Sequence, residues 1–457
     1  MERKELEKAL LEWNGGRTRK PLVLMGARQV GKTWLMEHFA QKVYPKDTVL
    51  VNLMEDEALR VSIEQASLDP QILLMLIQAR CGRRIVPGRT LLIIDEIQES
   101  PRALTALKFF SEKLPELAVM AAGSLLGLSL RHRRGTKSRE PRGSFPVGKV
   151  SFLDVHPLTF AEFLSACGED LKREALEEDQ REVVDLLHDE YVRLLKDYLF
   201  VGGMPEAVKA FVDERDYHAV RRIQKEILRA YDADFVKHAD ETLLGRLRLL
   251  WKNIPAQLAK ENKKYIYKAL KEGARGRDYE EALEWLDEAG MVHQVFRASP
   301  PRLPLKAYED FSAFKLYQHD VGLLGAMSDL PPSVILEGDS LFTNFKGALT
   351  EQYVLQELVA MGVEPSYWSA EKGDAEVDFL VQGGTAVYPI EVKAACNLKA
   401  KSLATYRGFF EPPICYRTSL ARRSDGNLIR DVPLFDLLRI AWEIQDSIGA
   451  ARRRSGI

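Results

Sequence analysis

Eight consecutive residues near the N-terminus have the types and spacing of a phosphate-binding loop. Residues 26–33 read GARQVGKT, which matches the pattern G-x-x-x-x-G-K-[ST]. An apolar run at 21–25 precedes them and a helical pattern at 34–41 follows, so the context is strand, glycine-rich loop and helix. Glycines let backbone N–H groups point at phosphate oxygens, and a helix N-terminus adds positive partial charge. We therefore predict a nucleoside triphosphate site rather than a glycine-rich turn with a solvated lysine.

The side chains that close this loop have separate expected roles. Lys32 is expected to contact the β- and γ-phosphates, and the Thr33 hydroxyl is expected to bind Mg²⁺. The predicted nucleotide contacts are Gly26, Ala27, Arg28, Gln29, Val30, Gly31, Lys32 and Thr33.

A second motif ends in two acidic residues. Residues 90–96 read TLLIIDE, in which four large apolar residues predict a buried strand with Asp95 and Glu96 at its carboxyl end. Ligands bind at that end of open parallel sheets. We expect Asp95 to bind Mg²⁺ and Glu96 to polarise the attacking water, the alternative being a helix-capping acid. Residues 117–124 read as a third strand with Ser124 at its carboxyl end, where it is expected to sense the γ-phosphate or orient the water, the alternative being a helix cap.

Composition excludes several classes of protein. The chain has 457 residues, 46% hydrophobic and 29% charged, with a formal net charge of −2, so no global basic charge indicates nucleic acid binding. Four cysteines form no C-x-x-C pair, which argues against a disulfide framework or a zinc site. The charged N-terminus is not a secretory signal and no apolar run is long enough to span a bilayer. We expect a cytoplasmic protein that does not bind membranes.

Several further stretches carry a resemblance to a known family. They are IDEIQE at 94–99, SFPVGK at 144–149, HPLTFAEF at 156–163, GGMP at 202–205, YED at 308–310 and GLL at 322–324. Over nearly its whole length the chain resembles prokaryotic AAA+ type ATPases that carry a C-terminal domain of unassigned function, DUF4143. The resemblance implies ATP hydrolysis in a homo-oligomer, where a neighbour's arginine often completes the site. Candidate arginines are Arg131, Arg133, Arg134, Arg139 and Arg142, unless this is only a flexible basic loop.

The middle of the chain is predicted to be helical. Residues 159–234 have a helical pattern that breaks at the GGMP segment. The resemblance implies that Gly203 and Pro205 lie near the nucleotide base, and the alternative is a plain interhelical turn. Residues 240–298 read as helix, helix and strand, the order of a winged helix. Its last helix is acidic, which favours a structural or protein-contact module over insertion into a DNA groove.

A third constellation lies near the C-terminus. Asp378 lies in one predicted strand, and Glu391 and Lys393 follow on the next, on one face of it. This spacing resembles the PD-(D/E)xK nuclease core, which implies that Asp378 and Glu391 hold Mg²⁺ and that Lys393 orients water. Glu351 fits the additional acid of such folds. The alternatives are a β-hairpin with a surface ion pair, or a nuclease fold that has lost its chemistry.

Together these patterns predict an α/β protein with four parts: a P-loop ATPase core (1–158), a helical lid (159–239), a winged-helix-like module (240–299) and a restriction-endonuclease-like α/β domain (300–457). We expect a Mg²⁺-dependent ATPase that binds ATP and ADP and whose turnover moves the C-terminal domain, with Lys32, Glu96 and Ser124 as its catalytic residues. The alternatives are an ATP-regulated nuclease and an ATP-switched module that binds DNA, RNA or protein.

Overall fold

The computed structural model describes residues 2–124, 146–260, 263–333, 343–394 and 401–444. The chain forms two compact units. The P-loop unit contains Arg3–His156 and Glu284–Met291, and the C-terminal unit contains Pro157–Leu283 and the chain from Val292 onward, together with the first two residues. The four parts predicted from the sequence are finer than these units, and their boundaries stay predictions.

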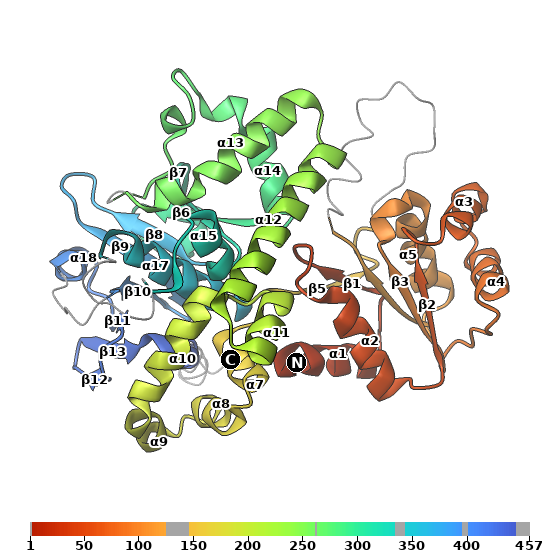
Figure 1. Cartoon of the computed structure of the whole chain (residues 1–457), viewed down its shortest axis with the longest axis horizontal. Helices are drawn as coiled ribbons and strands as arrows, with labels where there is room; N and C mark the ends of the chain where they lie inside the picture. The colour runs from red at the N-terminus through yellow and green to blue at the C-terminus, as the bar shows by residue number, and fades with distance from the viewer. Residues whose placement is uncertain (1, 125–145, 261–262, 334–342, 395–400, 445–457) are drawn as a thin grey trace. The chain divides into compact units, whose positions relative to one another are not determined.

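The P-loop unit is built around a parallel sheet of five strands in the order β2-β3-β4-β1-β5 (Figure 1). β3 is buried at every position, as its apolar sequence predicts for a central strand. β5 was not predicted from the sequence, since it has only four residues, which alternate between half-buried and exposed. The elements are α1 (Lys4–Gly15), β1 (Leu22–Met25), α2 (Lys32–Val43), β2 (Thr48–Asn52), α3 (Glu57–Gln65), α4 (Pro70–Cys81), β3 (Leu91–Asp95), the 3-10 helix η1 (Ile97–Glu99), α5 (Pro101–Lys113), β4 (Ala118–Ala122) and β5 (Ser151–Asp154).

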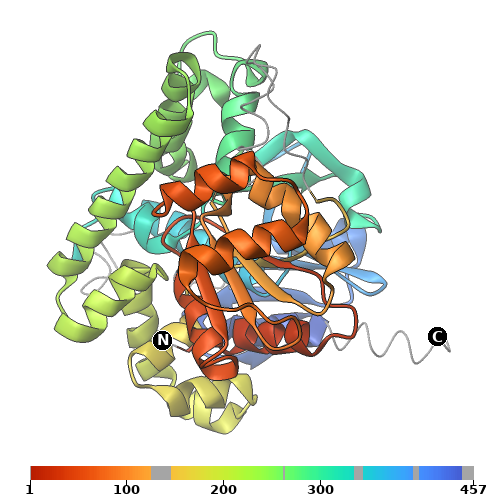
Figure 2. The same ribbon diagram turned by 90° about the vertical axis from the view of Figure 1, so that its right-hand side faces the viewer.

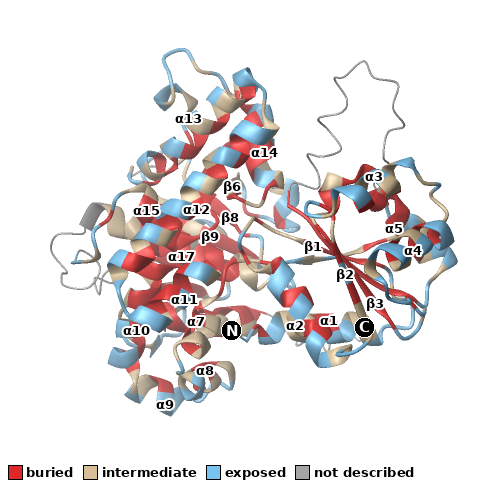
Figure 3. Ribbon diagram, turned by 45° about the vertical axis from the view of Figure 1, so that its right-hand side comes forward, coloured by how far each residue is buried: buried red, intermediate tan, exposed pale blue. Residues whose placement is uncertain are grey.

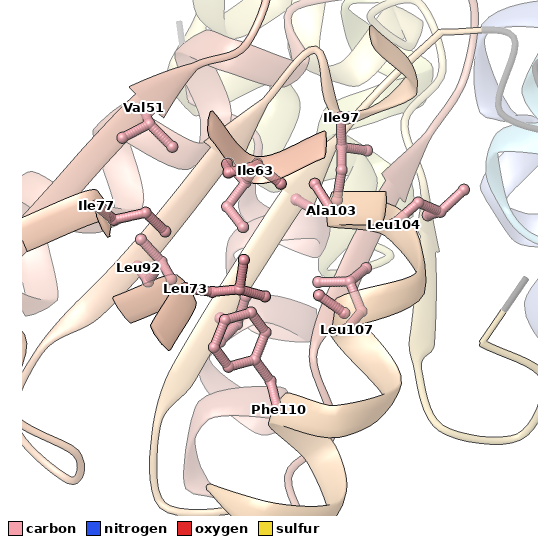
Figure 4. Packing of buried hydrophobic residues seen from close by; sticks show 14 of the residues in the cluster. Val51, Ile63, Leu73, Ile77, Leu92, Ile97, Ala103, Leu104, Leu107 and Phe110 are labelled. Atoms are coloured by element: carbon pink, nitrogen blue, oxygen red, sulfur yellow. The ribbon is translucent and has the colours of Figure 1, made fainter. Parts of the chain in front are cut away.

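Helices cover both faces of this sheet (Figure 2). On one face, alternate strand residues such as Val51 and Leu92 pack against α3, α4 and α5. Figure 4 shows the core of this face, where Leu107 and Phe110 of α5 lie with Leu73 of α4. On the other face α2 contacts β3 and β4. The central strands β3 and β4 are therefore buried at every position, and β3 is red in Figure 3, whereas the edge strand β2 is only partly buried.

The C-terminal unit combines helices with a mixed sheet of eight strands in the order β12-β13-β11-β10-β9-β8-β6-β7. β9 and β10 form an antiparallel hairpin, while β10, β11 and β13 run parallel. β6 joins the later strands through a parallel contact with β8, so strands on both sides of residue 300 share one sheet. The α/β fold class, with a parallel P-loop sheet and a C-terminal mixed sheet, is confirmed.

The helices of the C-terminal unit, including the span that α14 shares with the P-loop unit, are α7 (Phe160–Ala166), α8 (Asp170–Glu177), α9 (Arg181–Leu186), α10 (His188–Val201), α11 (Pro205–Glu214), α12 (Tyr217–His238), α13 (Glu241–Leu258), η3 (Tyr267–Ala269), η4 (Gly276–Asp278), α14 (Glu280–Glu288), η5 (Leu305–Tyr308), α15 (Val321–Met327), α17 (Thr343–Ala360), α18 (Lys401–Phe410) and η6 (Leu434–Asp436). Its strands are β6 (Val292–Ala298), β7 (Glu309–Gln318), β8 (Ser366–Ser369), β9 (Glu376–Gly383), β10 (Ala386–Val392), β11 (Cys415–Ser419), β12 (Ser424–Asp425) and β13 (Ile429–Pro433). Within the described part of the chain, no helix is both long and apolar enough to cross a membrane.

The packing of α4 gives a test of the P-loop unit's core. Leu73 is 2% exposed and lies in the core cluster, whereas Met75, two residues later on the same helix, is 59% exposed. Leu73→Ala should lower the free energy of unfolding by about 2–5 kcal/mol, because it removes buried methyl groups and leaves a cavity. Met75→Ala should change it by about 0.5 kcal/mol or less. Urea unfolding followed by circular dichroism measures both, and equal losses would contradict this packing.

Candidate functional site

The phosphate-binding loop connects β1 to α2 and depends on two glycines. Gly26 has φ +129°, and a Cβ on it would lie 2.2 Å from the Val155 carbonyl oxygen, so no side chain fits there. Gly31 precedes the first residue of α2 and has φ 93°, in the region that favours glycine. A 12-residue helix therefore begins at the loop, and the free N–H groups of its first turn are suited to binding an anion.

Lys32 is held inside this loop. Its ammonium donates hydrogen bonds to the carbonyl oxygens of Gly26, at 2.8 Å, and Ala27, at 2.7 Å. Burial lowers the pKa of Lys32 to about 8, and the neighbouring carboxylates of Glu96 and Asp95 only partly oppose this shift. The ammonium thus lies at the place where the loop's backbone would meet phosphate.

Thr33 and Asp95 come together although 62 positions separate them in the sequence. The Thr33 hydroxyl donates to Asp95 Oδ2 at 2.8 Å. Asp95 ends β3 and is 4% exposed, and burial raises the pKa of its carboxyl group. A hydroxyl and a carboxylate oxygen beside a phosphate-binding loop are suitable donors for Mg²⁺, so these residues fit that ion.

Glu96 has an unusual backbone conformation. Its φ of 50° and ψ of 43° are left-handed, and its N–H donates to Asp95 Oδ1 at 2.9 Å. The Glu96 carboxylate accepts a hydrogen bond from the amide of Gln98. Ser100, and not Glu96, caps α5 with its side chain, so the helix-capping alternative does not apply to Glu96 in that helix.

Ser124 lies just beyond β4, between the strands that carry the loop and Asp95. Its hydroxyl accepts a hydrogen bond from Arg28 Nε at 2.9 Å, so it contacts the loop directly. The segment that follows Ser124 lies outside the described residues, and with it the candidate arginines at positions 131–142. The capping alternative for Ser124 and the arginine prediction therefore stay open.

Gly203 and Pro205 lie in the C-terminal unit, where they form the turn between α10 and α11. The Gly203 N–H donates to Asp320 Oδ2 at 2.6 Å, and a Cβ on Gly203 would lie 2.1 Å from the Leu158 carbonyl oxygen. Burial raises the pKa of Asp320 to about 6. Pro205 is the first residue of α11. This packing accounts for the glycine within its own unit, and contact with nucleotide stays a prediction.

The C-terminal constellation is assembled from a helix and a hairpin. In the hairpin Ile390 pairs with Phe379, so Asp378 and Glu391 occupy the next position along the two strands. Lys393 Nζ lies 2.5 Å from Glu391 Oε1. Glu391 is 3% exposed, which excludes the surface ion pair considered for it. Glu351 lies on α17 and is 4% exposed.

Three residues of this cluster were not predicted from the sequence as part of the site. Lys263 forms an ion pair with Glu351, and the Tyr317 hydroxyl donates to Glu351 Oε2 at 3.1 Å. Lys315, on β7, is fully buried and faces the same acids. A signal was present, because Lys315 stands between apolar residues of a strand, where a charge is costly unless it is paired.

The protonation of the cluster follows from burial and mutual contact. Burial, and then the carboxylates of Glu351 and Glu391, raises the pKa of Asp378 well above its usual range. Burial also raises the pKa of Glu391, although Lys393 opposes the shift. For Glu351, Lys263 and Lys315 outweigh the effect of burial and lower the pKa.

The described residues contain no group of three or more His, Cys, Asp or Glu side chains arranged to hold a metal ion. The carboxylates of this cluster nevertheless have the chemistry that divalent cations prefer. One oxygen, Glu391 Oε2, is buried and accepts no hydrogen bond from any described residue. Asp378 and Glu391 therefore fit a cation, whereas Glu351 is engaged by Lys263 and Tyr317.

Comparison with known proteins identifies three segments. Residues 18–164 match an AAA domain, residues 192–334 match a domain of unknown function (DUF8612), and residues 346–433 match a domain of unknown function (DUF4143). No curated protein matches the chain.

Among solved structures, the chain is similar to the Walker-type ATPase PABY2304 of Pyrococcus abyssi, at 14% identity over 72% of this chain and 95% of that one, with a TM-score of 0.44. It is also similar to the Aeropyrum pernix ORC1 protein in complex with DNA, at 14% identity over 72% and 91%, with a TM-score of 0.27. The Thermotoga maritima RuvB Holliday junction branch migration motor matches at 15% identity over 64% and 88%, with a TM-score of 0.28.

The assignment rests on the domain matches, since all three TM-scores are below 0.5. The AAA domain contains the glycine loop, Asp95 and Glu96, and the DUF4143 match contains Glu351, Asp378, Glu391 and Lys393. As the sequence predicts, the chain carries an AAA domain of the P-loop ATPase type followed by a DUF4143 domain.

Proposed function

We propose that this protein is a Mg²⁺-dependent ATPase whose turnover changes the conformation of its C-terminal, nuclease-like part. The observation that carries the proposal is the 2.8 Å hydrogen bond from Thr33 to Asp95 Oδ2, beside a loop that holds Lys32. A loop that only binds phosphate does not need a buried carboxylate next to its threonine. An acid in that position supports metal binding and hydrolysis.

Each residue of the loop and strand has a role in this proposal. The backbone N–H groups of Gly26–Thr33 bind phosphate oxygens, and Lys32 exchanges its two carbonyl partners for the β- and γ-phosphates. Thr33 and Asp95 would hold Mg²⁺, which when bound neutralises charge on the phosphates. Glu96 accepts a proton from the attacking water, and its hydrogen bond with Gln98 orients the carboxylate. Ser124 senses the γ-phosphate through its contact with Arg28.

Two substitutions separate binding from hydrolysis. Lys32→Ala should weaken ATP binding by about 30-fold or more, because losing one charge-assisted contact costs about 2–5 kcal/mol. Glu96→Gln should keep ATP bound and lower kcat by about 10²–10⁴-fold, because the general base is lost. Titration with a fluorescent ATP analogue and phosphate release measure the two effects.

Lys42, which is 51% exposed on the same helix as Lys32, provides the matched control. Lys42→Ala should leave both binding and turnover unchanged. Normal turnover in either Lys32→Ala or Glu96→Gln would reject the assigned roles.

The pKa of Lys32 predicts a dependence of ATP binding on pH. Since burial lowers this pKa from 10.5 to about 8, the ammonium is present below pH 8 and is lost as the pH rises through that value. ATP affinity should therefore fall by about tenfold per pH unit above pH 8. Lys32→Arg should bind more weakly but without this dependence, since a guanidinium stays charged. An affinity for the unaltered protein that is constant to pH 9.5 would contradict the lowered pKa of Lys32.

A second candidate function is cleavage of DNA or RNA by the C-terminal cluster under control of ATP. The convergence of Asp378, Glu391 and Lys393 supports it. A second support is Glu391 Oε2, which is buried and has no hydrogen-bond partner among the described residues. In this proposal Asp378 and Glu391 would hold Mg²⁺, and Lys393 would orient water or stabilise charge on the phosphorus.

This candidate is tested by incubating the full chain with DNA or RNA, Mg²⁺ or Mn²⁺, and ATP. Asp378→Ala should lower the cleavage rate by about 10²-fold or more, because one of the two carboxylates that would hold Mg²⁺ is lost. Asp374→Ala should not change the rate, since this acid is exposed and lies just before the same strand. Cleavage that survives Asp378→Ala belongs to another site or to a contaminant.

A third candidate is a nucleotide-dependent binding module. The two-unit division of the chain supports it, because ATP bound to one unit can alter the affinity of the other for DNA, RNA or protein. The proposal also includes a homo-oligomer, in which a neighbour's arginine completes the site, and a cytoplasmic location. Slow hydrolysis together with an ATP-dependent change in partner binding would favour this candidate.

A further inference from the structure

The C-terminal carboxylates surround a lysine that lies far outside the predicted Asp378, Glu391 and Lys393 motif. Lys315 Nζ lies 2.5 Å from Glu376 Oε1 and 3.9 Å from both Asp378 Oδ1 and Glu351 Oε2. The side chain is completely buried and its Nζ lies 4.9 Å from the centre of the Tyr367 ring. Lys315 is therefore a positive charge fixed among acids.

Burying an ammonium group is unfavourable unless opposite charges compensate it. Three carboxylates within 4 Å provide that compensation here, and the ring face of Tyr367 adds to it. The converse also holds, because several carboxylates in one buried cluster repel one another unless a cation lies among them. In two-metal phosphoryl-transfer sites a second divalent ion supplies that charge.

The acids of this cluster differ in which of their oxygens are left to bind a cation. Glu351 is occupied at both oxygens, by Lys263 and by the Tyr317 hydroxyl. Asp378 Oδ2 accepts the Val392 N–H at 2.8 Å, which leaves Oδ1 on the side of Lys315. Glu391 contacts Lys393 through Oε1, while its buried Oε2 accepts no hydrogen bond within the described part of the chain. Asp378 and Glu391 thus provide donors for one cation.

We infer that the C-terminal cluster binds one divalent cation, held by Asp378 and Glu391, and that the Lys315 ammonium permanently takes the place of a second one. This inference rests on the proposed nuclease-like site. It adds Lys315 as a residue that fixes how many ions the site takes. Lys263 and Lys315 lie in the segment matched by DUF8612, 192–334, whereas the acids lie in the DUF4143 segment, so the site needs both segments.

The number of bound Mn²⁺ ions tests the inference directly. The full chain is titrated with Mn²⁺ without nucleotide, and free Mn²⁺ is followed by electron paramagnetic resonance. An Asp95→Asn background removes the acid that would hold an ion at the phosphate loop. One ion per chain is expected in this background, and none after Glu391→Gln. Two ions, or none, in the background protein would overturn the inference.

Variants of Lys315 supply the matched comparison. Lys315→Met, which keeps the length and removes the charge, should bind two Mn²⁺ ions, and Lys315→Arg should still bind one. A single ion in Lys315→Met would overturn the inference. Since Lys315→Met leaves acids uncompensated, Lys315→Met combined with Glu376→Gln serves as a second variant. Its Tm should rise by several degrees on addition of Mn²⁺, and more than that of the background protein. No difference between the two Tm shifts would count against Lys315 as the internal cation.

The outcomes distinguish this inference from the proposed functions. Two ions in the background protein would reject the role of Lys315 while leaving metal-dependent cleavage intact. ATP turnover, measured on Lys315→Met in a chain with Asp95 restored, reports separately on the phosphate loop. One ion without any cleavage would retain the inference and reject only the nuclease activity.

Discussion

Lys32 and Lys315 are both buried ammonium groups, and the cost of removing such a charge from water constrains each candidate site. Lys32 meets that cost with two carbonyl oxygens of its own loop and with the carboxylates of Glu96 and Asp95. Lys315 meets it with Glu376, Asp378 and Glu351. Because unpaired buried charge is destabilising, the strands and helices that carry the partners must keep their register. In this sense the positions of β3, β7 and β9 depend on electrostatics as well as on apolar packing.

The sheet of the P-loop unit explains how distant motifs meet. All five strands run parallel, so their carboxyl ends lie along one edge, and the loop after β1 is separated from β3 only by β4. Ser124, at the end of the strand between them, contacts Arg28 for the same reason. Strand order therefore brings together residues that the sequence separates by 62 to 96 positions.

Features encoded by contiguous residues were the ones that could be predicted. The glycine loop, the apolar run ending in Asp95, and the two strands β9 and β10 each combine a local pattern with a local conformation. The partners Lys263 and Lys315 could not be predicted, because their contacts with Glu351 cross 88 and 36 positions of sequence. The pairing of β6 with β8 is likewise non-local, and β5 is too short to give a clear periodicity. The apolar neighbours of Lys315 marked it as unusual without naming its partners.

If Lys32 binds phosphate as proposed, its bonds to its own loop make nucleotide binding an exchange reaction. In the proposed ATPase, incoming phosphates would replace the carbonyl oxygens of Gly26 and Ala27 as partners of the ammonium. The measured affinity is then the difference between two sets of contacts, not the sum of the new ones. A substitution that weakens the bonds of Lys32 to the two carbonyl oxygens, without changing the backbone that binds phosphate, would tighten nucleotide binding. It would also slow nucleotide release. The carbonyl oxygens of Gly26 and Ala27 would thus compete with phosphate for the Lys32 ammonium. The rate of product release would then depend in part on these two residues.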